Sequence, residues 1–528
     1  MKELGMEFSK LEFLKFDSAL WQRVVSLLEY DPTSPLTLST GFFLFALFAF
    51  SVGYIIIRRR PNLRTWYVTL FSLYFYYKLS GLYILLLLFV ALSDYIIGRC
   101  IAHRNNNIKS TRGLVALSVT INVAILVYFK ATGFFVGVLD NLYVDGVLNF
   151  EGVVVPAGVS FFVFQSIAYV VDISRGTIKP LSRFMDYLFL LSFFPKMFLG
   201  PLVKAKDFIP QIEARDNTVS RDDFGRAVTL IAGGLLKYAV IASALGALFV
   251  NPAFKGELGD SGVVALLAIY GFTMQIYCDF SGYSDIAGGV ALMMGFRLPD
   301  NFDAPYKSVT ITEFWRRWHI SLSTWLKDYL YIALGGNRRG SLRTYINLFL
   351  TMVLGGLWHG VSICYMAWGV LHGLALALHK IWLKIIPWAK KTGAEMHPII
   401  RFGATLITLH IVAFGWLLFA SAQQKPAFGE DLALCHDMID RIVNNFHLAD
   451  IVPAVETSGV AIVIMCVGYI MHYLPKRLNG TIQRMVTRSG FVGQWLLIVA
   501  VIWIVMQCSA MLLAETGVAA GLPMYADY

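Results

Sequence analysis

The sequence predicts an all-α protein that crosses a membrane many times. Of its 528 residues, 57% are hydrophobic and only 15% are charged, whereas soluble domains carry about 25% charged residues. The apolar residues lie in many blocks along the whole chain, separated by charge, proline or glycine. A chain of this length has room for about a dozen spans of roughly 20 residues each. We therefore expect about 11 or 12 transmembrane helices, with re-entrant and interfacial helices among them.

The chain divides into two predicted parts. Apolar residues between positions 19 and 30 share one helical face, which predicts an amphipathic segment on the outer surface over residues 1–40. A single membrane domain is expected over residues 41–528. Its spans are predicted near 41–57, 66–78, 80–98, 113–130, 153–172, 224–250, 261–294, 341–357, 359–380, 399–420, 459–474 and 492–514.

Basic and acidic stretches alternate along the chain. Acidic residues predominate in 131–152 and in the predicted outer loop 421–458. Twelve crossings place every basic stretch on one side, as the positive-inside rule requires of cytoplasmic loops. Membrane topology therefore accounts for the net charge of +10, and nucleic acid is not expected as a partner. The seven basic stretches, which hold 33 of the 44 Lys and Arg residues, are 58–65, 99–112, 173–183, 204–226, 295–343, 380–401 and 475–490.

Three regions depart from simple spans. Residues 184–203 are apolar but interrupted by two prolines and a glycine, with basic residues on both sides, which predicts a re-entrant segment. The predicted span 261–294 contains Asp279 and Asp285, and carboxylates within a span usually face the protein interior or a cavity. Residues 312–332 alternate aromatic and basic side chains, which is typical of an interfacial or half-buried helix.

Two of the ten histidines, His319 and His359, lie in unusual surroundings. His319 follows aromatic and basic residues, and His359 is flanked by glycines. The apolar run 344–357 has 14 residues, about 21 Å as a helix and shorter than the hydrocarbon core, so His359 is expected below the outer surface. Two imidazoles at the neck of a cavity can act as a general base and a helper that binds or orients substrate.

The alternative for any membrane histidine is a hydrogen bond between helices. We favour that interpretation for four other histidines, which are His372, His379, His410 and His472. The sequence contains no HExxH or related histidine cluster, so a metal site is not expected. It also contains no GxxxxGK[ST] phosphate loop and no GxSxG elbow, which argues against ATP-driven pumping and ordinary serine hydrolysis.

A basic region that includes the predicted interfacial helix and the residues after it offers a phosphate-binding site. Arginine and lysine are well suited to the phosphates of a coenzyme. The alternative is that these residues are basic only because they lie in an inward loop. The candidate donor-binding residues are Arg316, Arg317, Lys327, Asn337 and Arg338.

Five blocks of the sequence carry a recognisable pattern, and they are 277–285, 301–306, 314–323, 335–338 and 355–360. In this order and spacing they closely resemble the membrane-bound O-acyltransferase (MBOAT) family. The match is to the bacterial branch that contains the alginate O-acetylation membrane subunit and the teichoic-acid D-alanylation protein. The specific resemblance extends from about residue 153 to about residue 380.

The resemblance implies a fold in which tilted helices surround a central tunnel. His359 corresponds to the principal catalytic histidine of the family and His319 to the second active-site residue. For Asp279 and Asp285 the alternative role is to fix neighbouring helices. The residues expected to line the tunnel are Tyr277, Asp279, Ser281, Asp285, Trp315 and Trp358.

The function implied is transfer of an acyl group across the bacterial cytoplasmic (inner) membrane. Acetyl-CoA, or another acyl thioester, is expected as the donor substrate, with no cofactor bound permanently. The acceptor is expected to be a hydroxyl, so that an exported cell-envelope polysaccharide becomes O-acetylated. Expected partners are membrane lipid, a polysaccharide biosynthesis complex, and an extracytoplasmic SGNH-like acetyltransferase or small membrane protein carrying an acceptor serine.

Two other functions are compatible with the sequence. One is a transporter or flippase of a lipid-linked or acyl-carrying substrate, since broken helices and buried carboxylates also occur in transporters. The other is a non-catalytic assembly subunit of a polysaccharide machine. Loss of acyl transfer on replacing His359 would distinguish catalysis from both.

Overall fold

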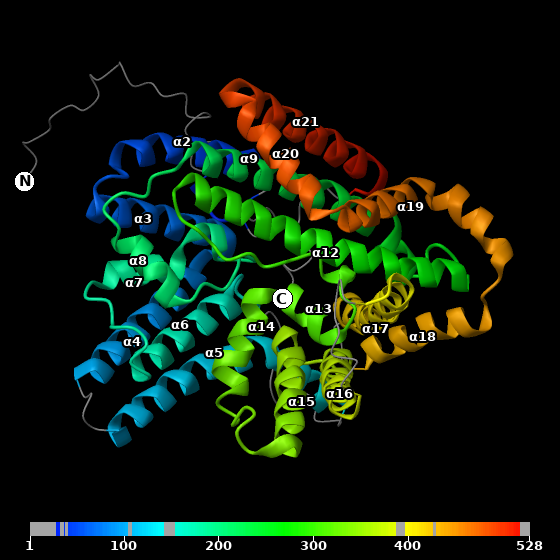
Figure 1. The fold of residues 1–528 in the computed structure, drawn as a ribbon, viewed down its shortest axis with the longest axis horizontal. Coiled ribbons are helices and arrows are strands. Elements are labelled where there is room, and N and C mark those ends of the chain that lie inside the picture. The colour runs from blue at the N-terminus through cyan, green and yellow to red at the C-terminus, as the bar shows by residue number, and fades with distance from the viewer. Residues whose placement is uncertain are drawn as a thin grey trace, which may run out of the picture.

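The computed structural model describes residues 28–31, 36, 38, 41–103, 108–141, 154–386, 396–425 and 429–517. These residues form helices joined by short connections, and none of them is in a strand (Figure 1). The predicted amphipathic segment over 1–40 lies almost wholly outside the described residues. The all-α prediction is confirmed.

The helices lie close to the predicted spans. Eight helical stretches are long and apolar enough to cross a membrane, by length and composition. The longer helices are α2 (Gly41–Ile57), α3 (Pro61–Ser80), α4 (Ile84–His103), α5 (Ile108–Asn141), α6 (Val159–Ser174), α9 (Arg221–Leu235), α12 (Gly262–Met293), α15 (Gly340–His359), α16 (Ile363–Ile385), α17 (Pro398–Gln424), α19 (Ile451–Tyr473) and α21 (Gly490–Thr516). The shorter helices are α7 (Phe184–Ser192), α8 (Ala205–Glu213), α10 (Ser243–Leu245), α11 (Asn251–Phe254), α13 (Ile311–Arg317), α14 (Ile320–Trp325), α18 (Glu430–Asn444) and α20 (Lys476–Arg488).

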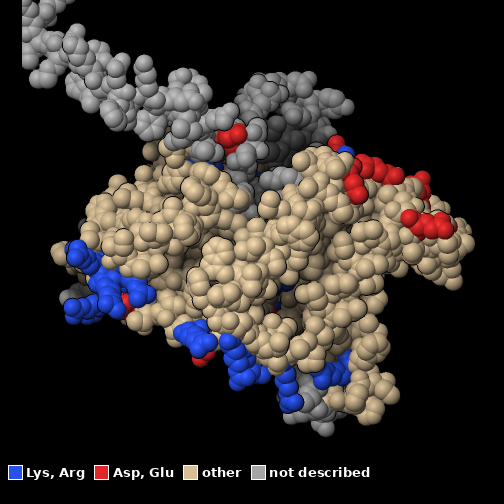
Figure 2. Space-filling view, turned by 90° about the horizontal axis from the view of Figure 1, so that it is seen from above, with Lys and Arg blue, Asp and Glu red and all other residues tan. Residues whose placement is uncertain are grey.

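Charged side chains separate onto two faces of the molecule. Figure 2 shows Lys and Arg gathered along one face, with a few acidic residues among them, and the other visible Asp and Glu along the opposite face, with a broad band of other residues between. We call these the basic face and the acidic face. The separation is what the alternation of charged stretches predicts for a multi-pass membrane protein.

The segment after α7 is irregular and buried, as the re-entrant prediction requires. After α7 ends at Ser192, residues 197–204 are not helical, yet nearly all of them are buried. Lys196 in this segment donates from Nζ to Gln165 Oε1 at 2.5 Å and to the Leu190 carbonyl at 2.7 Å. Protein therefore covers the irregular backbone and satisfies the buried ammonium.

Helix α12 is the central element of the fold. Its 32 residues pack against α9, α17, α18 and α19, and 25 of them are buried. A Cβ atom built on Gly282 would lie 2.8 Å from the Gly234 carbonyl oxygen of α9. Glycine at this position therefore lets α9 approach the middle of α12 at backbone distance.

Two regions differ from their predicted structure. The predicted outer loop 421–458 contains α18, which packs against α12 and α17. The predicted interfacial helix over 312–332 is broken at His319 into α13 and α14, followed by a π-helical turn over Leu326–Tyr331. The helix break places His319 on the wall of the chamber described below.

Candidate active site

Helices α15 and α16 meet at backbone distance and hold His359 where α15 ends. A Cβ atom on Gly356 would lie 2.3 Å from the Tyr365 carbonyl oxygen, and one on Gly369 would lie 2.6 Å from the Met352 carbonyl oxygen. Only residues without side chains permit this approach. The close contact fixes the position of the last turn of α15, which carries Trp358 and His359.

His319 lies at the break between α13 and α14, in a backbone conformation that is rare for residues other than glycine. Its φ is 42° and its ψ is 56°, and such strain persists only where the surroundings enforce it. Two backbone hydrogen bonds do so: Ile320 N donates to the Asn301 carbonyl at 2.9 Å, and Asp303 N donates to the Arg317 carbonyl at 3.0 Å. The helix break therefore directs the imidazole inward, where it is 2% exposed.

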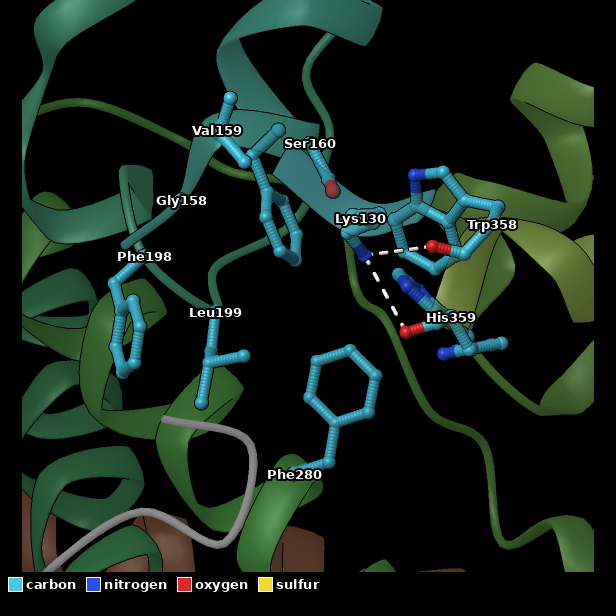
Figure 3. A pocket seen from close by; sticks show the side chains of 11 residues that line it. Lys130, Gly158, Val159, Ser160, Phe198, Leu199, Phe280, Trp358 and His359 are labelled. Carbon is cyan, nitrogen blue, oxygen red and sulfur yellow. Dashed lines mark hydrogen bonds between the residues drawn. The ribbon is translucent and has the colours of Figure 1, made fainter. Parts of the chain in front are cut away.

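His319 and His359 line one small chamber, with a volume of about 40 Å³. The rest of its wall comes from α5, the start of α6, the re-entrant segment and α12, several of whose residues are labelled in Figure 3. Trp358, which was expected to line the tunnel, also contributes. The remaining lining residues are Lys130, 158–161, Phe198, Leu199 and Phe280.

Asn301 determines which nitrogen of His319 carries the proton. Its Oδ1 atom accepts hydrogen bonds from the backbone N–H of Ser321 at 3.2 Å and from Ser321 Oγ at 2.9 Å. Because a backbone N–H can only donate, this atom is the amide oxygen. His319 Nδ1, 3.1 Å from the same oxygen, must therefore donate as well. Nε2 of the neutral ring then carries the lone pair, and it has no hydrogen-bond partner among the described residues.

His359 lies below the ends of its neighbouring helices. Its ring contacts Phe419 of α17 at a centroid distance of 4.9 Å, five residues before that helix ends at Gln424. Lys130 of α5 contacts its carbonyl, 11 residues before that helix ends at Asn141. At 1.5 Å per residue, these helices continue about 7 Å and 16 Å further toward the acidic stretches.

The predicted depth of His359 is supported, but the reason given for it was wrong. Helix α15 has 20 residues, from Gly340 to His359, rather than the 14 of the apolar run. Its length is about 30 Å, which is enough to cross the hydrocarbon core. The longer neighbouring helices, and not a short α15, place His359 beneath the acidic face.

Lys130 joins α5 to the end of α15. Its Nζ donates to the Trp358 carbonyl at 2.6 Å and lies 3.5 Å from the His359 carbonyl oxygen (Figure 3). The last carbonyls of a helix lack partners within the helix and carry its negative dipole end, so an ammonium group is favourable there. Nζ also lies 5.1 Å from the centre of the Trp358 ring.

Three residues of α12 that were predicted to line the tunnel, Tyr277, Ser281 and Asp285, lie around the ammonium group of Lys237. Lys237 forms an ion pair with Asp285 and donates to Ser281 Oγ at 3.2 Å. The same ammonium lies 5.9 Å from the centre of the Tyr277 ring. These three residues are not among the described residues that line the chamber, and the pairing with Lys237 favours the structural alternative for Asp285.

Asp279 and Trp315 also lie outside the chamber. Asp279 lines a separate cavity of about 460 Å³, together with Gln275 and Glu515. Trp315 donates from Nε1 to His372 Nδ1 at 3.4 Å. Its ring packs on the ring of Trp368, which in turn contacts the ring of His359. Trp315 therefore contacts His359 indirectly, through Trp368.

The five candidate donor-binding residues lie on α13, in the π-helical turn after α14 and in the loop before α15, and none is among the described residues that line the chamber. Arg317 pairs with Glu313 at 2.6 Å, and Lys327 lies 3.6 Å from Asp328. Asn337 Oδ1 accepts hydrogen bonds from Tyr331 and, at 3.3 Å, from Lys380. Arg316 and Arg338 are exposed. Donor binding by these residues stays a prediction.

The four histidines interpreted as structural are all hydrogen-bonded. His379 Nδ1 lies 2.7 Å from Thr312 Oγ1, His472 Nε2 accepts from Tyr306 N at 3.1 Å, and His410 Nδ1 lies 2.7 Å from the Leu406 carbonyl. His372 accepts from Trp315. The interpretation as a hydrogen bond between elements is confirmed for His372, His379 and His472, whereas the bond of His410 lies within its own helix and does not support it. Among the described residues, no three His, Cys, Asp or Glu side chains gather as metal ligands.

Sequence reasoning missed the roles of Lys130 and Asn301. The signal for Lys130 was a lysine at the end of a long apolar run, which was taken as the end of a span. Asn301 belongs to a block that resembles the family, but its distance of 18 residues from His319 gives no hint of a contact.

Comparison with known proteins places this arrangement in a family. The model of the MBOAT, membrane-bound O-acyltransferase, family matches residues 154–418, half of the chain. The chain is 38% identical over 350 residues to a probable alginate O-acetylase of Pseudomonas aeruginosa, covering 66% of this chain and 65% of that relative, which is less than two thirds of the relative's length. It is 30% identical over 479 residues to a peptidoglycan O-acetyltransferase of Helicobacter pylori, covering 82% of this chain and 89% of that protein.

A third relative has a different acyl group in its name. The chain is 29% identical over 280 residues to a teichoic acid D-alanyltransferase of Bacillus subtilis, covering 50% of this chain and 68% of that protein.

Both histidines of the chamber lie within the residues that the family model matches. The chain therefore belongs to the membrane-bound O-acyltransferase family.

Proposed function

We propose that this protein is a membrane O-acyltransferase that carries an acetyl group from acetyl-CoA to a hydroxyl on the other side of the membrane. The observation that carries the proposal is the chamber, in which His319 and His359 from separate elements line one space. Relatives named as O-acetylases and O-acetyltransferases of envelope polymers support the class of reaction.

The reaction exchanges a thioester for an ester. The acceptor oxygen attacks the thioester carbonyl, the new C–O bond forms and the C–S bond breaks. The hydroxyl proton passes to an imidazole and then to the departing thiolate, which leaves as the free thiol of coenzyme A. A general base within reach of the hydroxyl and a donor near the carbonyl oxygen each accelerate such a transfer.

The two histidines have different roles in this proposal. His359 accepts the proton of the attacking hydroxyl. His319 accepts a hydrogen bond through Nε2 and so orients the hydroxyl, because its Nδ1 already donates to Asn301. In this tautomer neutral His319 has no proton to offer a carbonyl oxygen. The polarising donor is then Lys130, whose ammonium lies on the chamber wall.

The two faces supply the two substrates. The basic face is the cytoplasmic side, where acetyl-CoA arrives and where Arg316, Arg317, Lys327, Asn337 and Arg338 hold its phosphates. The acidic face is extracytoplasmic, and the acceptor reaches His359 from there. The membrane is the bacterial inner membrane, and the final acceptor is an exported envelope polysaccharide, reached through an extracytoplasmic partner that carries an acceptor serine.

Reconstituted vesicles test this function. Acetyl-CoA labelled in the acetyl group is enclosed on the side of the basic face, and candidate hydroxyl acceptors are supplied on the side of the acidic face. Wild type should transfer label, while His359→Ala and His319→Ala should each lower the rate by at least about 100-fold. His410→Ala is the matched control, because His410 is an exposed histidine whose Nδ1 contacts the Leu406 carbonyl of its own helix and which is not among the described residues that line the chamber.

Two outcomes would refute the proposal. Label transfer that survives both His359→Ala and His319→Ala would show that these imidazoles are not catalytic. Movement of intact labelled substrate across the vesicle wall, without a new ester, would instead identify a transporter.

A further inference from the structure

We infer that Lys130 selects the acyl group by charge, so that the chamber accepts a neutral acetyl group and rejects an aminoacyl group. This inference rests on the proposed function and extends it to donor specificity. It addresses a choice that the relatives pose, since their names include both acetyl and D-alanyl transfer.

The charge of the chamber wall carries the inference. Among the described lining residues, Lys130 is the one lysine or arginine, and none is a carboxylate. Its neighbours on the wall are glycine, serine, aliphatic and aromatic residues and the two histidines. An aminoacyl thioester would bring a second ammonium group into this space, where the described lining residues offer it no acidic side chain.

The position of Lys130 is fixed rather than adjustable. Its Nζ is held by the Trp358 carbonyl at 2.6 Å and lies against the face of the Trp358 ring. Among the described residues no carboxylate forms an ion pair with it. Two unit charges 5 Å apart repel by about 3 kcal/mol at an effective dielectric constant of 20, which corresponds to roughly 100-fold discrimination.

Chamber size acts in the same direction. A volume of about 40 Å³ beside the two histidines compares with roughly 10–15 Å³ for a cavity that holds one water molecule. The chamber therefore fits a group the size of acetyl. Leu199, which is 3% exposed and lies on the wall, limits this space from the re-entrant segment.

Isosteric donors separate charge from size. Propionyl and glycyl thioesters have nearly the same shape but differ by the ammonium group, and acetyl and propionyl thioesters differ by one methylene. Each is presented on the same carrier thiol to the purified full-length protein in vesicles, and the rate of ester formation is measured. Wild type should prefer propionyl to glycyl by at least about tenfold, and acetyl to propionyl.

Three variants show whether the charge of Lys130 and the size of Leu199 cause these preferences. Lys130→Met keeps the length of the side chain and should lower the propionyl-to-glycyl ratio at least about fivefold, even as the overall rate falls. Lys130→Arg keeps the charge and should keep the ratio. Leu199→Ala should admit propionyl better while leaving the propionyl-to-glycyl ratio unchanged.

The results distinguish failure of the charge selection from failure of the proposed acyltransferase function. A propionyl-to-glycyl ratio that Lys130→Met does not change, in protein that still transfers acetyl, overturns the charge selection and leaves the acyltransferase function intact. A wild-type protein that transfers none of the donors overturns both. Because the readout is a ratio within one protein sample, partial misfolding of a variant does not imitate the expected result.

Discussion

The Oδ1 atom of Asn301 accepts a hydrogen bond from Nδ1 of His319 at 3.1 Å, and the same oxygen accepts one from the backbone N–H of Ser321 at 3.2 Å. One amide therefore fixes both the tautomer of the imidazole and the path of the chain just after the helix break. Asn301 is 3% exposed, so water cannot readily replace it. It is a positioning residue for His319.

Replacing Asn301 by alanine should lower kcat with little change in the KM for acetyl-CoA. The substitution leaves a buried N–H of His319 and two donors of Ser321 without an acceptor, at a cost of about 1–3 kcal/mol. Because this free energy holds the His319 ring in its reactive orientation, its loss should decrease kcat by about 10- to 100-fold. Steady-state kinetics in vesicles measure the change.

Ser284→Ala is the matched control for Asn301→Ala. Asn301 Nδ2 donates a hydrogen bond to Ser284 Oγ at 3.2 Å. Ser284→Ala removes this bond but keeps the contact between Asn301 Oδ1 and His319. It should change kcat by less than about threefold. An equal loss in both variants would mean that Asn301 acts through general packing and not through the imidazole.

Two variants that both lack the imidazole can measure the backbone strain at His319. Glycine tolerates a positive φ, so His319→Gly should be more stable than His319→Ala by about 1 kcal/mol, although both should be inactive. Thermal unfolding in detergent compares the two. Greater stability of the alanine variant would contradict the strain deduced from the φ of 42°.

The ion pair between Lys237 and Asp285 is expected to stabilise the fold and not to act in catalysis. Asp285→Ala leaves the ammonium, whose side chain is only 18% exposed, without its counter-charge. We expect a loss of about 2 kcal/mol, and the double variant Lys237→Met with Asp285→Leu should recover most of it. Full stability combined with lost acyl transfer in Asp285→Ala would instead support the tunnel-lining role.

Local patterns in the sequence predicted the helices, while contacts between distant segments determined the site. Apolar length and basic flanks mark a helix such as α12 without reference to the rest of the protein. The contact of Lys130 with the His359 carbonyl joins residues 229 positions apart, and no periodicity encodes it. The helix break at His319 likewise depends on hydrogen bonds with residues 301–303, so a continuous amphipathic pattern over 312–332 concealed it.

The glycines between α15 and α16 should be required for activity. Gly369→Ala places a Cβ atom 2.6 Å from the Met352 carbonyl oxygen, so the helices must separate. We expect lower thermal stability by about 2 kcal/mol and a loss of acyl transfer, because His359 moves with α15. Gly403→Ala is the control, since a Cβ atom on that residue of α17 meets nothing within 4 Å and alanine favours a helix. Equal effects at the two positions would argue against the close contact.

Charge reversal on the basic face should locate the donor site. Lys327→Glu and Arg338→Glu change exposed side chains near the predicted phosphate site, so they should raise the KM for acetyl-CoA about threefold to tenfold and leave kcat unchanged. Arg484→Glu on α20 changes the same net charge elsewhere on the surface. If the donor binds near α13, only the first two variants should weaken binding, and added salt should reduce the difference between them and wild type. An equal increase for Arg484→Glu would indicate attraction by the whole face rather than a phosphate site at these residues.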